Sequence, residues 1–184
     1  MTLHSNDDLY KINKILILYN LTLNILWTIL AVMPISLFIG FNPPDIKGFV
    51  IVLIISILPF FLPNSFLDRI KFGKTTKTYE KMGVLFIQKI TQNGDIVNKQ
   101  IRKKFPGYRT VSYKKSSINN LIRQTFSFEK YHIMMFIIFS LTSIYALSKI
   151  HLWWAIIISI INLLYNICPI LLQHYIRLKL ALHK

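Results

Sequence analysis

The chain has 184 residues, of which 53% are apolar and only 16% are charged, against about 25% charged in ordinary soluble domains. Its formal net charge of +15 lies between long apolar segments, a distribution typical of basic segments beside membrane spans, and no motif of a nucleic-acid-binding module is present. Composition therefore excludes a soluble domain and a nucleic-acid partner, and it predicts an all-α integral membrane protein.

Two apolar segments open the chain. Residues 15–41 contain no charged side chain, and at 1.5 Å per residue they are long enough to cross ~30 Å of hydrocarbon. The N-terminal residues lack the positive region and the cleavage site of a signal peptide, so we expect this first span to be retained. Residues 49–63 form a second, shorter span that contains Pro59.

A basic segment of 64–130 separates these spans from the rest. It holds 15 of the 22 basic residues and 4 of the 7 acidic ones, a net charge of +11. By the positive-inside rule we expect this insert to be cytoplasmic. Within it, 79–90 and 98–105 have the apolar spacing of amphipathic helices, and 116–128 is expected to continue as a helix into the third span.

Two more spans are predicted at 131–148 and 152–173, joined by a turn of three residues. The sequence thus predicts about four transmembrane helices, both termini on the cytoplasmic side, and a multi-pass protein of the cell (inner) membrane. The single cysteine, Cys168, lies in an apolar stretch, where we expect it to serve packing. No metal site is predicted, because no cysteine or histidine spacing of a metal site exists.

Glu129 and His132 lie three residues apart, where the third span begins. At this spacing they share one face of a helix, and ionisable groups at such a depth are costly and usually functional. They are therefore candidate catalytic residues.

A polar row lies near the end of the fourth span. Asn166, Pro169, Gln173 and Arg177 recur at 0, 3, 7 and 11, which is one stripe of a helix. Antiparallel helices joined by a short turn are neighbours, so the row is expected at the depth of the Glu129 pair. A purely structural role, as interface anchors and interhelical hydrogen bonds, remains an open alternative.

The sequence resembles the glycosyl-4,4′-diaponeurosporenoate acyltransferase family, the membrane acyltransferases of staphyloxanthin-type carotenoid biosynthesis. Three motifs carry the resemblance, over about residues 63–180. They are Tyr79-Glu80-Lys81-Met82-Gly83, Glu129-x-x-His132, and Asn166-x-x-Pro169-Ile-x-x-Gln173-x-Tyr175-x-Arg177-x-Lys179-Leu180. This chain has His174 where the family usually has a basic residue.

The resemblance implies transfer of a fatty acyl group from an acyl thioester to a hydroxyl of a glycolipid or glycosylated isoprenoid. We hypothesise that His132 is the general base and that Glu129 orients its imidazole. Asn166 or Gln173 is expected to donate to the developing oxyanion, and Arg177 to hold donor phosphates.

The remaining predicted substrate-binding residues are Tyr175, Tyr79 and Glu80, the last two at the entrance. The donor is expected to be acyl-coenzyme A or an acyl-carrier protein, with no other cofactor. The expected partners are this donor and membrane lipids, and a homo-oligomer is an open possibility.

Two rival functions remain at this point. A Glu-x-x-His followed by Asn and Arg also suits a membrane reductase of lipids or isoprenoids that uses a nicotinamide cofactor, although no glycine-rich dinucleotide loop is present. A non-catalytic membrane scaffold would instead use the basic insert to hold enzymes or anionic lipid.

Overall fold

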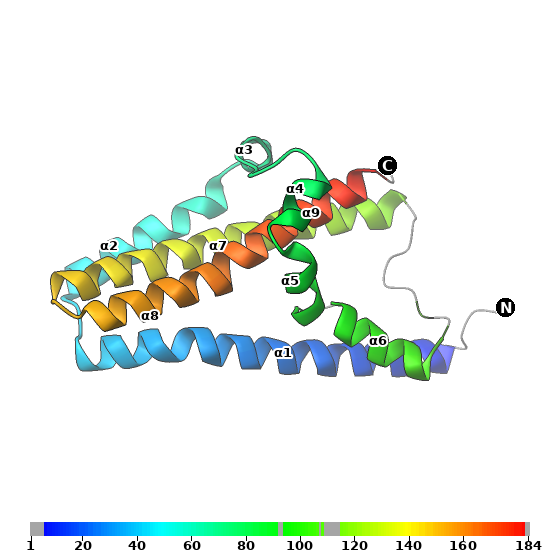
Figure 1. Ribbon diagram of the computed structural model, residues 1–184, viewed down its shortest axis with the longest axis horizontal. Helices are drawn as coiled ribbons and strands as arrows, with labels where there is room; N and C mark the ends of the chain where they lie inside the picture. The colour runs from blue at the N-terminus through cyan, green and yellow to red at the C-terminus, as the bar shows by residue number, and fades with distance from the viewer. Residues whose placement is uncertain (1–5, 92–93, 107, 109–114, 183–184) are drawn as a thin grey trace.

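A computed structural model describes residues 6–91, 94–106, 108 and 115–182, which form helices and turns with no β-strand among them (Figure 1). The predicted all-α fold is confirmed. The helices are α1 (Asn6–Phe41), α2 (Ile46–Ile57), the 3₁₀ helix η1 (Leu58–Phe61), α3 (Asn64–Arg69), α4 (Thr76–Lys81), α5 (Val84–Ile90), α6 (Asp95–Lys104), α7 (Lys115–Ser148), α8 (Leu152–Asn162), the π-helix η2 (Leu163–Ile167) and α9 (Cys168–Ala181).

Helix α1 runs along one side of the molecule, and Pro34 lies inside it without ending it (Figure 1). It begins nine residues before the predicted span of 15–41. Most of its apolar side chains are exposed, as expected for a helix that faces lipid. Ala31, Ile35 and Phe38 are buried in one apolar cluster with side chains of α7 and α8.

The second predicted span, 49–63, is a shorter helix than the others. Helix α2 begins at Ile46, where the Asp45 carboxylate accepts a 2.7 Å hydrogen bond from the Gly48 amide, and η1 ends at Phe61. The chain turns away at Leu62 and Pro63. Three helical segments are long and apolar enough to cross a membrane: Tyr10–Phe41, Ser117–Ser148 and Leu152–Ala181. Ile46–Phe61 is apolar but shorter.

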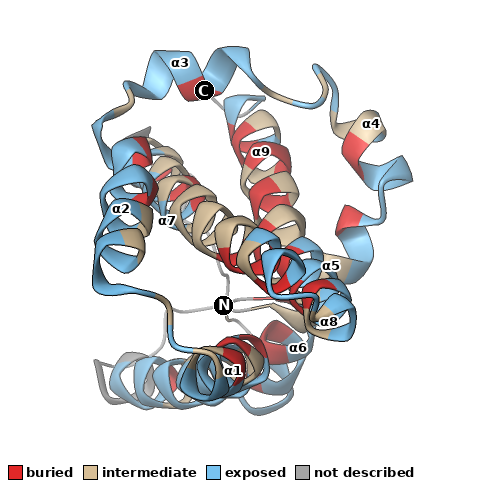
Figure 2. Cartoon of the chain, turned by 90° about the vertical axis from the view of Figure 1, so that its left-hand side faces the viewer, coloured by how far each residue is buried: buried red, intermediate tan, exposed pale blue. Residues whose placement is uncertain are grey.

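Helix α7 and the α8–η2–α9 segment form the centre of the molecule. The predicted continuation of 116–128 into the third span is confirmed, because α7 is one helix from Lys115 to Ser148. The fourth span continues past residue 173 to Ala181. Buried residues concentrate on the facing sides of these helices, whereas α1 and α2 are largely exposed (Figure 2).

A wide turn interrupts the fourth span. In η2 the Cys168 amide donates to the Leu163 carbonyl, five residues back, which is the hydrogen bond of a π-helix. Pro169 explains this position, because proline has no N–H to offer the carbonyl of Tyr165 four residues earlier. The extra residue in this turn changes which side chains of α9 face α7.

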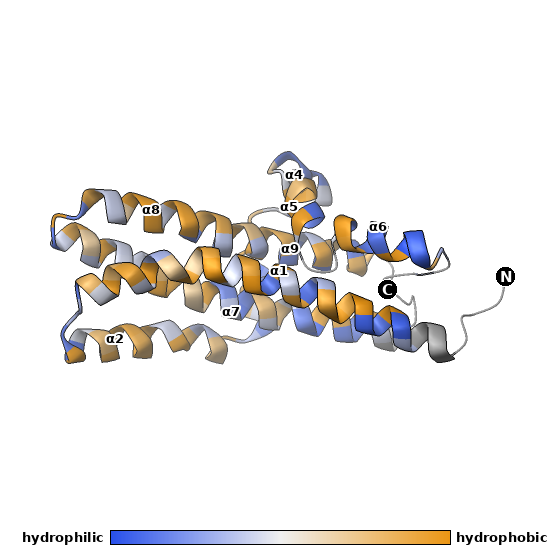
Figure 3. Cartoon of the chain, turned by 90° about the horizontal axis from the view of Figure 1, so that it is seen from below, coloured by the Kyte–Doolittle hydropathy of each residue, from blue (hydrophilic) through white to orange (hydrophobic). Residues whose placement is uncertain are grey.

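Among the described residues, the polar insert forms the short helices α3 to α6, of which α3, α4 and α5 lie near the middle of the long axis and α6 lies beside the beginning of α1 (Figure 1). Hydrophilic residues are concentrated in the half of the molecule that holds α6 and the beginning of α1 (Figure 3). The predicted helix of 98–105 corresponds to α6. The prediction of one helix over 79–90 is wrong, because Gly83 has φ +82°, a left-handed conformation that ends α4 and separates it from α5.

Candidate functional site

A buried cluster of charged side chains joins α7 to α9. The two oxygens of the Glu129 carboxylate lie 2.6 Å from His174 Nε2 and 2.6 Å from Arg177 Nη2. Glu129 and His174 are each 1% exposed and Arg177 is 4% exposed. The Arg177 contact is an ion pair without the alignment of a hydrogen bond. Removing one member of such a buried pair leaves an uncompensated charge, so the cluster holds the two helices in one register.

Side chains of α7 and α3 surround the Arg177 guanidinium. It stacks on Phe126 at 4.1 Å from the ring centroid, and its Nη1 lies 3.5 Å from Thr125 Oγ1. Its Nε is 3.9 Å from the Asp68 carboxylate, which pairs more closely, at 2.7 Å, with Lys71. The Arg177 guanidinium is therefore buried and is bound by side chains of the protein itself.

Helix α4 closes the other side of the cluster. The hydroxyl of Tyr79 lies 3.3 Å from His174 Nδ1 and makes two 3.1 Å hydrogen bonds with the backbone of Gly73, one to the carbonyl and one from the amide. Tyr79 is fully buried, and burial raises the pKa of its phenol. Both ring nitrogens of His174 thus have protein partners.

A second polar chain links α7 to α8 and η2. His132 Nδ1 lies 3.4 Å from Asn166 Oδ1, Asn166 Nδ2 donates to Asn162 Oδ1 at 2.8 Å, and Asn162 Nδ2 donates to the Phe136 carbonyl at 3.1 Å and to Ser140 Oγ at 3.0 Å. Asn166 is fully buried, whereas His132 is half-buried. The chain begins at a backbone carbonyl and ends at a partly accessible imidazole.

Aromatic rings flank that imidazole. The ring centroids of Tyr131 and Tyr165 lie 5.2 and 5.9 Å from that of His132, both in edge-to-face geometry. The Tyr165 hydroxyl is 3.5 Å from Thr28 Oγ1, so α1 also reaches this region. His132 is thereby held between apolar ring faces and one amide.

The predicted convergence of α7 and α9 is observed, but the predicted pairing of Glu129 with His132 is wrong. None of the ion pairs among the described residues joins these two side chains. The reason is that Glu129 finds a guanidinium and an imidazole on α9, which compensate a buried carboxylate better than one neutral ring.

The predicted stripe on the fourth span is also shifted. Because η2 adds a residue to one turn, the buried polar face is Asn162, Asn166, His174 and Arg177, and Gln173 is only half-buried. Within the described part of the chain, Gln173 takes part in no hydrogen bond through its side chain. His174 and Asn162 were missed from the sequence. Pro169 is the sequence feature that could have indicated the shift to His174. The i, i+4 spacing of Asn162 and Asn166 is the feature that could have indicated Asn162.

The motif around Tyr79 is not an open entrance. Tyr79 is buried against His174, and the hydroxyl of Tyr175, itself 4% exposed, lies 3.4 Å from Glu80 Oε1. These contacts, with Val84 and Leu172, dock α4 and α5 on α9. Among the described residues, no three His, Cys, Asp or Glu side chains lie together as potential metal ligands.

A family model described as glycosyl-4,4′-diaponeurosporenoate acyltransferase matches residues 63–183. No curated protein and no solved structure matches the chain. The match begins just before α3 and covers every residue of the two polar groups described above, while α1, α2 and η1 lie outside it.

Proposed function

The chain belongs to the glycosyl-4,4′-diaponeurosporenoate acyltransferase family, and from that membership we propose that it moves a fatty acyl group from a thioester to a hydroxyl of a glycosylated lipid or isoprenoid in the membrane. It is an acyltransferase and a membrane protein, so neither the reductase nor the scaffold is retained. The donor, the acceptor and the residues that act on them are the proposed part.

His132 is the better of the two candidate general bases. A base must reach the proton that it removes, within about 2.6–3.2 Å. His174 is 1% exposed, and its two ring nitrogens face Glu129 and Tyr79. His132 is half-buried, and its Nδ1 faces the amide oxygen of Asn166.

The observation that carries the proposal is the orientation of the Asn166 amide. Its nitrogen donates to Asn162, so its oxygen faces His132 and accepts a hydrogen bond from the Nδ1–H group. A neutral imidazole has one N–H, and with that proton on Nδ1 the lone pair is on Nε2. Asn166 thus takes the orienting role that the sequence suggested for Glu129.

In the proposed reaction, His132 Nε2 removes the proton of the acceptor hydroxyl as its oxygen attacks the thioester carbonyl carbon. The tetrahedral intermediate collapses with cleavage of the C–S bond, and the imidazolium returns its proton to the leaving thiolate. Gln173 is the candidate donor to the oxyanion, because the Asn166 nitrogen already binds Asn162. The reaction needs no cofactor beyond the thioester donor.

We further propose that the polar end of the molecule faces the cytoplasm at the inner membrane. The net charge of +11 on residues 64–130 supports this orientation by the positive-inside rule. In this arrangement the shorter helix Ile46–Phe61 crosses a locally thinned bilayer as a fourth span. The lipid acceptor stays in the bilayer while its sugar reaches His132, and the thioester arrives from the water.

The test is acyl transfer from a fatty acyl thioester to a glycolipid by the purified protein. His132→Ala is expected to reduce kcat by about 10²–10⁴-fold, the usual contribution of a general base. His151→Ala is the matched control, since it removes an imidazole that pairs with Asn42 at the opposite end of the helices. A folded His132→Ala protein with an unchanged rate would overturn the assignment.

A further inference from the structure

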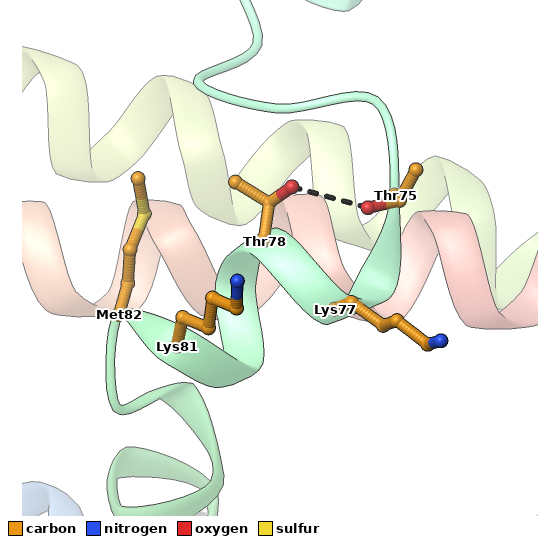
Figure 4. Close-up of a pocket in the computed structure, with 5 residues that line it drawn as sticks. All are labelled: Thr75, Lys77, Thr78, Lys81 and Met82. Carbon is orange, nitrogen blue, oxygen red and sulfur yellow. Dashed lines mark hydrogen bonds between the residues drawn. The ribbon is translucent and has the colours of Figure 1, made fainter.

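The sequence predicts that Arg177 binds the phosphates of a soluble acyl donor, and the structure does not support this role. Arg177 lies in the interior against Glu129 and Phe126, so it is not available to a ligand from the water. A hollow on the outer side of α4 has the right chemistry instead. It is lined by Thr75, Lys77, Thr78, Lys81 and Met82 (Figure 4).

The hydroxyl wall of this hollow is held in place. Thr75 Oγ1 and Thr78 Oγ1 lie 3.1 Å apart, so one hydroxyl donates to the other and a proton is left for a ligand (Figure 4). Behind them, Gly73 is held by the Tyr79 hydroxyl through its amide and carbonyl. A Cβ at Gly73 would lie 2.7 Å from Thr78 Cγ2, so the glycine permits this close approach.

The charge of the hollow is uniformly positive. Lys77 and Lys81 are one helical turn apart, and neither ammonium takes part in the ion pairs of the described residues. In Figure 4 the Lys81 side chain rises toward Thr78, while the Lys77 side chain extends from the same helix away from Lys81. No carboxylate lines the hollow, and the nearby Glu80 carboxylate faces the Tyr175 hydroxyl.

We propose that this hollow binds a phosphate group of the soluble acyl donor, of the kind carried by coenzyme A. Two ammonium groups and one free hydroxyl proton are suitable donors for the oxygens of a phosphate, and hydrogen bonds from charged donors are the stronger ones. The hollow lies on the helix that closes the Glu129 cluster, beside α9 (Figure 1). The inference rests on the proposed acyl transfer.

Binding of coenzyme A to the full-length protein in neutral-lipid nanodiscs tests this site. The double variant Lys77→Gln/Lys81→Gln is expected to raise the Kd of coenzyme A by about 10-fold, because it removes charged donors to phosphate. The control Lys99→Gln/Lys103→Gln removes the same charge from exposed positions of α6 and is expected to leave Kd unchanged. Pantetheine, which has no phosphate, should bind the wild type and both variants equally.

Several results would overturn the site. They are no binding of coenzyme A to the wild type, an equal loss in both double variants, or an unchanged Kd in Lys77→Gln/Lys81→Gln. If the variant instead loses only its preference for discs with phosphatidylglycerol, the hollow holds lipid phosphate and the donor assignment is wrong. His132→Ala separates the two proposals, because it should lose transfer while it keeps coenzyme A binding.

Discussion

The two polar groups between α7 and the fourth span differ in charge and in accessibility. The Glu129–His174–Arg177 cluster is ionic and at most 4% exposed, and α4 covers it through Tyr79. The His132–Asn166–Asn162 chain consists of an imidazole and two amides, and it ends at a half-buried ring. Both groups join α7 to the fourth span, the cluster through α9 and the amide chain through α8 and η2.

This difference indicates that the ionic cluster serves the stability of the fold and that the proposed chemistry lies at the end of the amide chain. A buried ionic cluster with every ring nitrogen occupied has no position for a substrate, but it fixes the packing of α4, α7 and α9. A chain of amides carries no charge to compensate, so it can end at an imidazole that is partly open. If His132 is the base, as we propose, strong charge in a membrane helix is by itself a poor guide to the catalytic residue.

The largest expected effect comes from breaking the cluster. Glu129→Gln leaves Arg177 buried without its carboxylate, and we expect it to lower the free energy of unfolding by about 3–5 kcal/mol. Denaturation of the protein in detergent measures this. His132→Ala, in the other group, should change it by much less. Equal stability of Glu129→Gln and the wild type would remove the distinction between the two groups.

Breaking the amide chain should lower the rate of acyl transfer more strongly than it lowers the stability of the fold. Asn166→Leu removes the acceptor of the His132 Nδ1 proton, and we expect kcat to fall about 10- to 100-fold, less than for loss of the base itself. KM should stay nearly constant, because Asn166 is fully buried and does not touch substrate. A folded Asn166→Leu protein with an unchanged kcat would show that the orienting role is wrong.

A substitution at Gly73, which the Tyr79 hydroxyl binds, tests how α4 packs against the Glu129–His174–Arg177 cluster. In Gly73→Ala the new methyl group would lie 2.7 Å from Thr78 Cγ2, and we expect a loss of about 1–3 kcal/mol as the segment shifts. Gly40, where an added Cβ meets nothing within 4 Å, provides the control Gly40→Ala. Thermal unfolding measures the stability of both variants. A similar change in Gly73→Ala and Gly40→Ala would show that the close contact between Gly73 and Thr78 is unimportant.

The smallest effect is expected for Tyr79→Phe, which removes the hydroxyl between Gly73 and His174 and should cost about 1 kcal/mol. Burial raises the pKa of this phenol above its usual 10.0, so the unfolded chain ionises first as pH rises. The stabilising contribution is complete below pH 10 and is lost as pH increases from there. Alkaline unfolding curves should be shallower for Tyr79→Phe, and identical slopes would contradict this.

Much of the fold could be predicted because membrane segments obey strong local rules. Charge-free runs long enough to cross a bilayer gave α1, α7 and the fourth span, and the short turn at 149–151 made α7 and α8 neighbours. The break at Gly83 was not predicted, because the apolar spacing of 79–90 continues through it. Its positive φ is set by how α4 and α5 both dock on α9.

The sequence could predict which helices carry the candidate site, but not which of its side chains pair with one another. Residue types and motif order predicted that Glu129, His132, Asn166 and Arg177 lie on two neighbouring helices. Their pairing depended on the π-turn of η2, which moves His174 onto the face that an ideal helix would give to Gln173. Pro169 is visible in the sequence, but the hydrogen-bond pattern around a proline is settled by the neighbouring helix.

The sequence by itself determined the helical membrane fold, the basic insert and the family, because hydropathy, charge and motif spacing are properties of the chain read one segment at a time. Only the tertiary structure decided which partner each polar side chain has. A buried carboxylate binds whichever guanidinium and imidazole nitrogens the packing brings closest, and here those are on α9 and not at the next turn of its own helix.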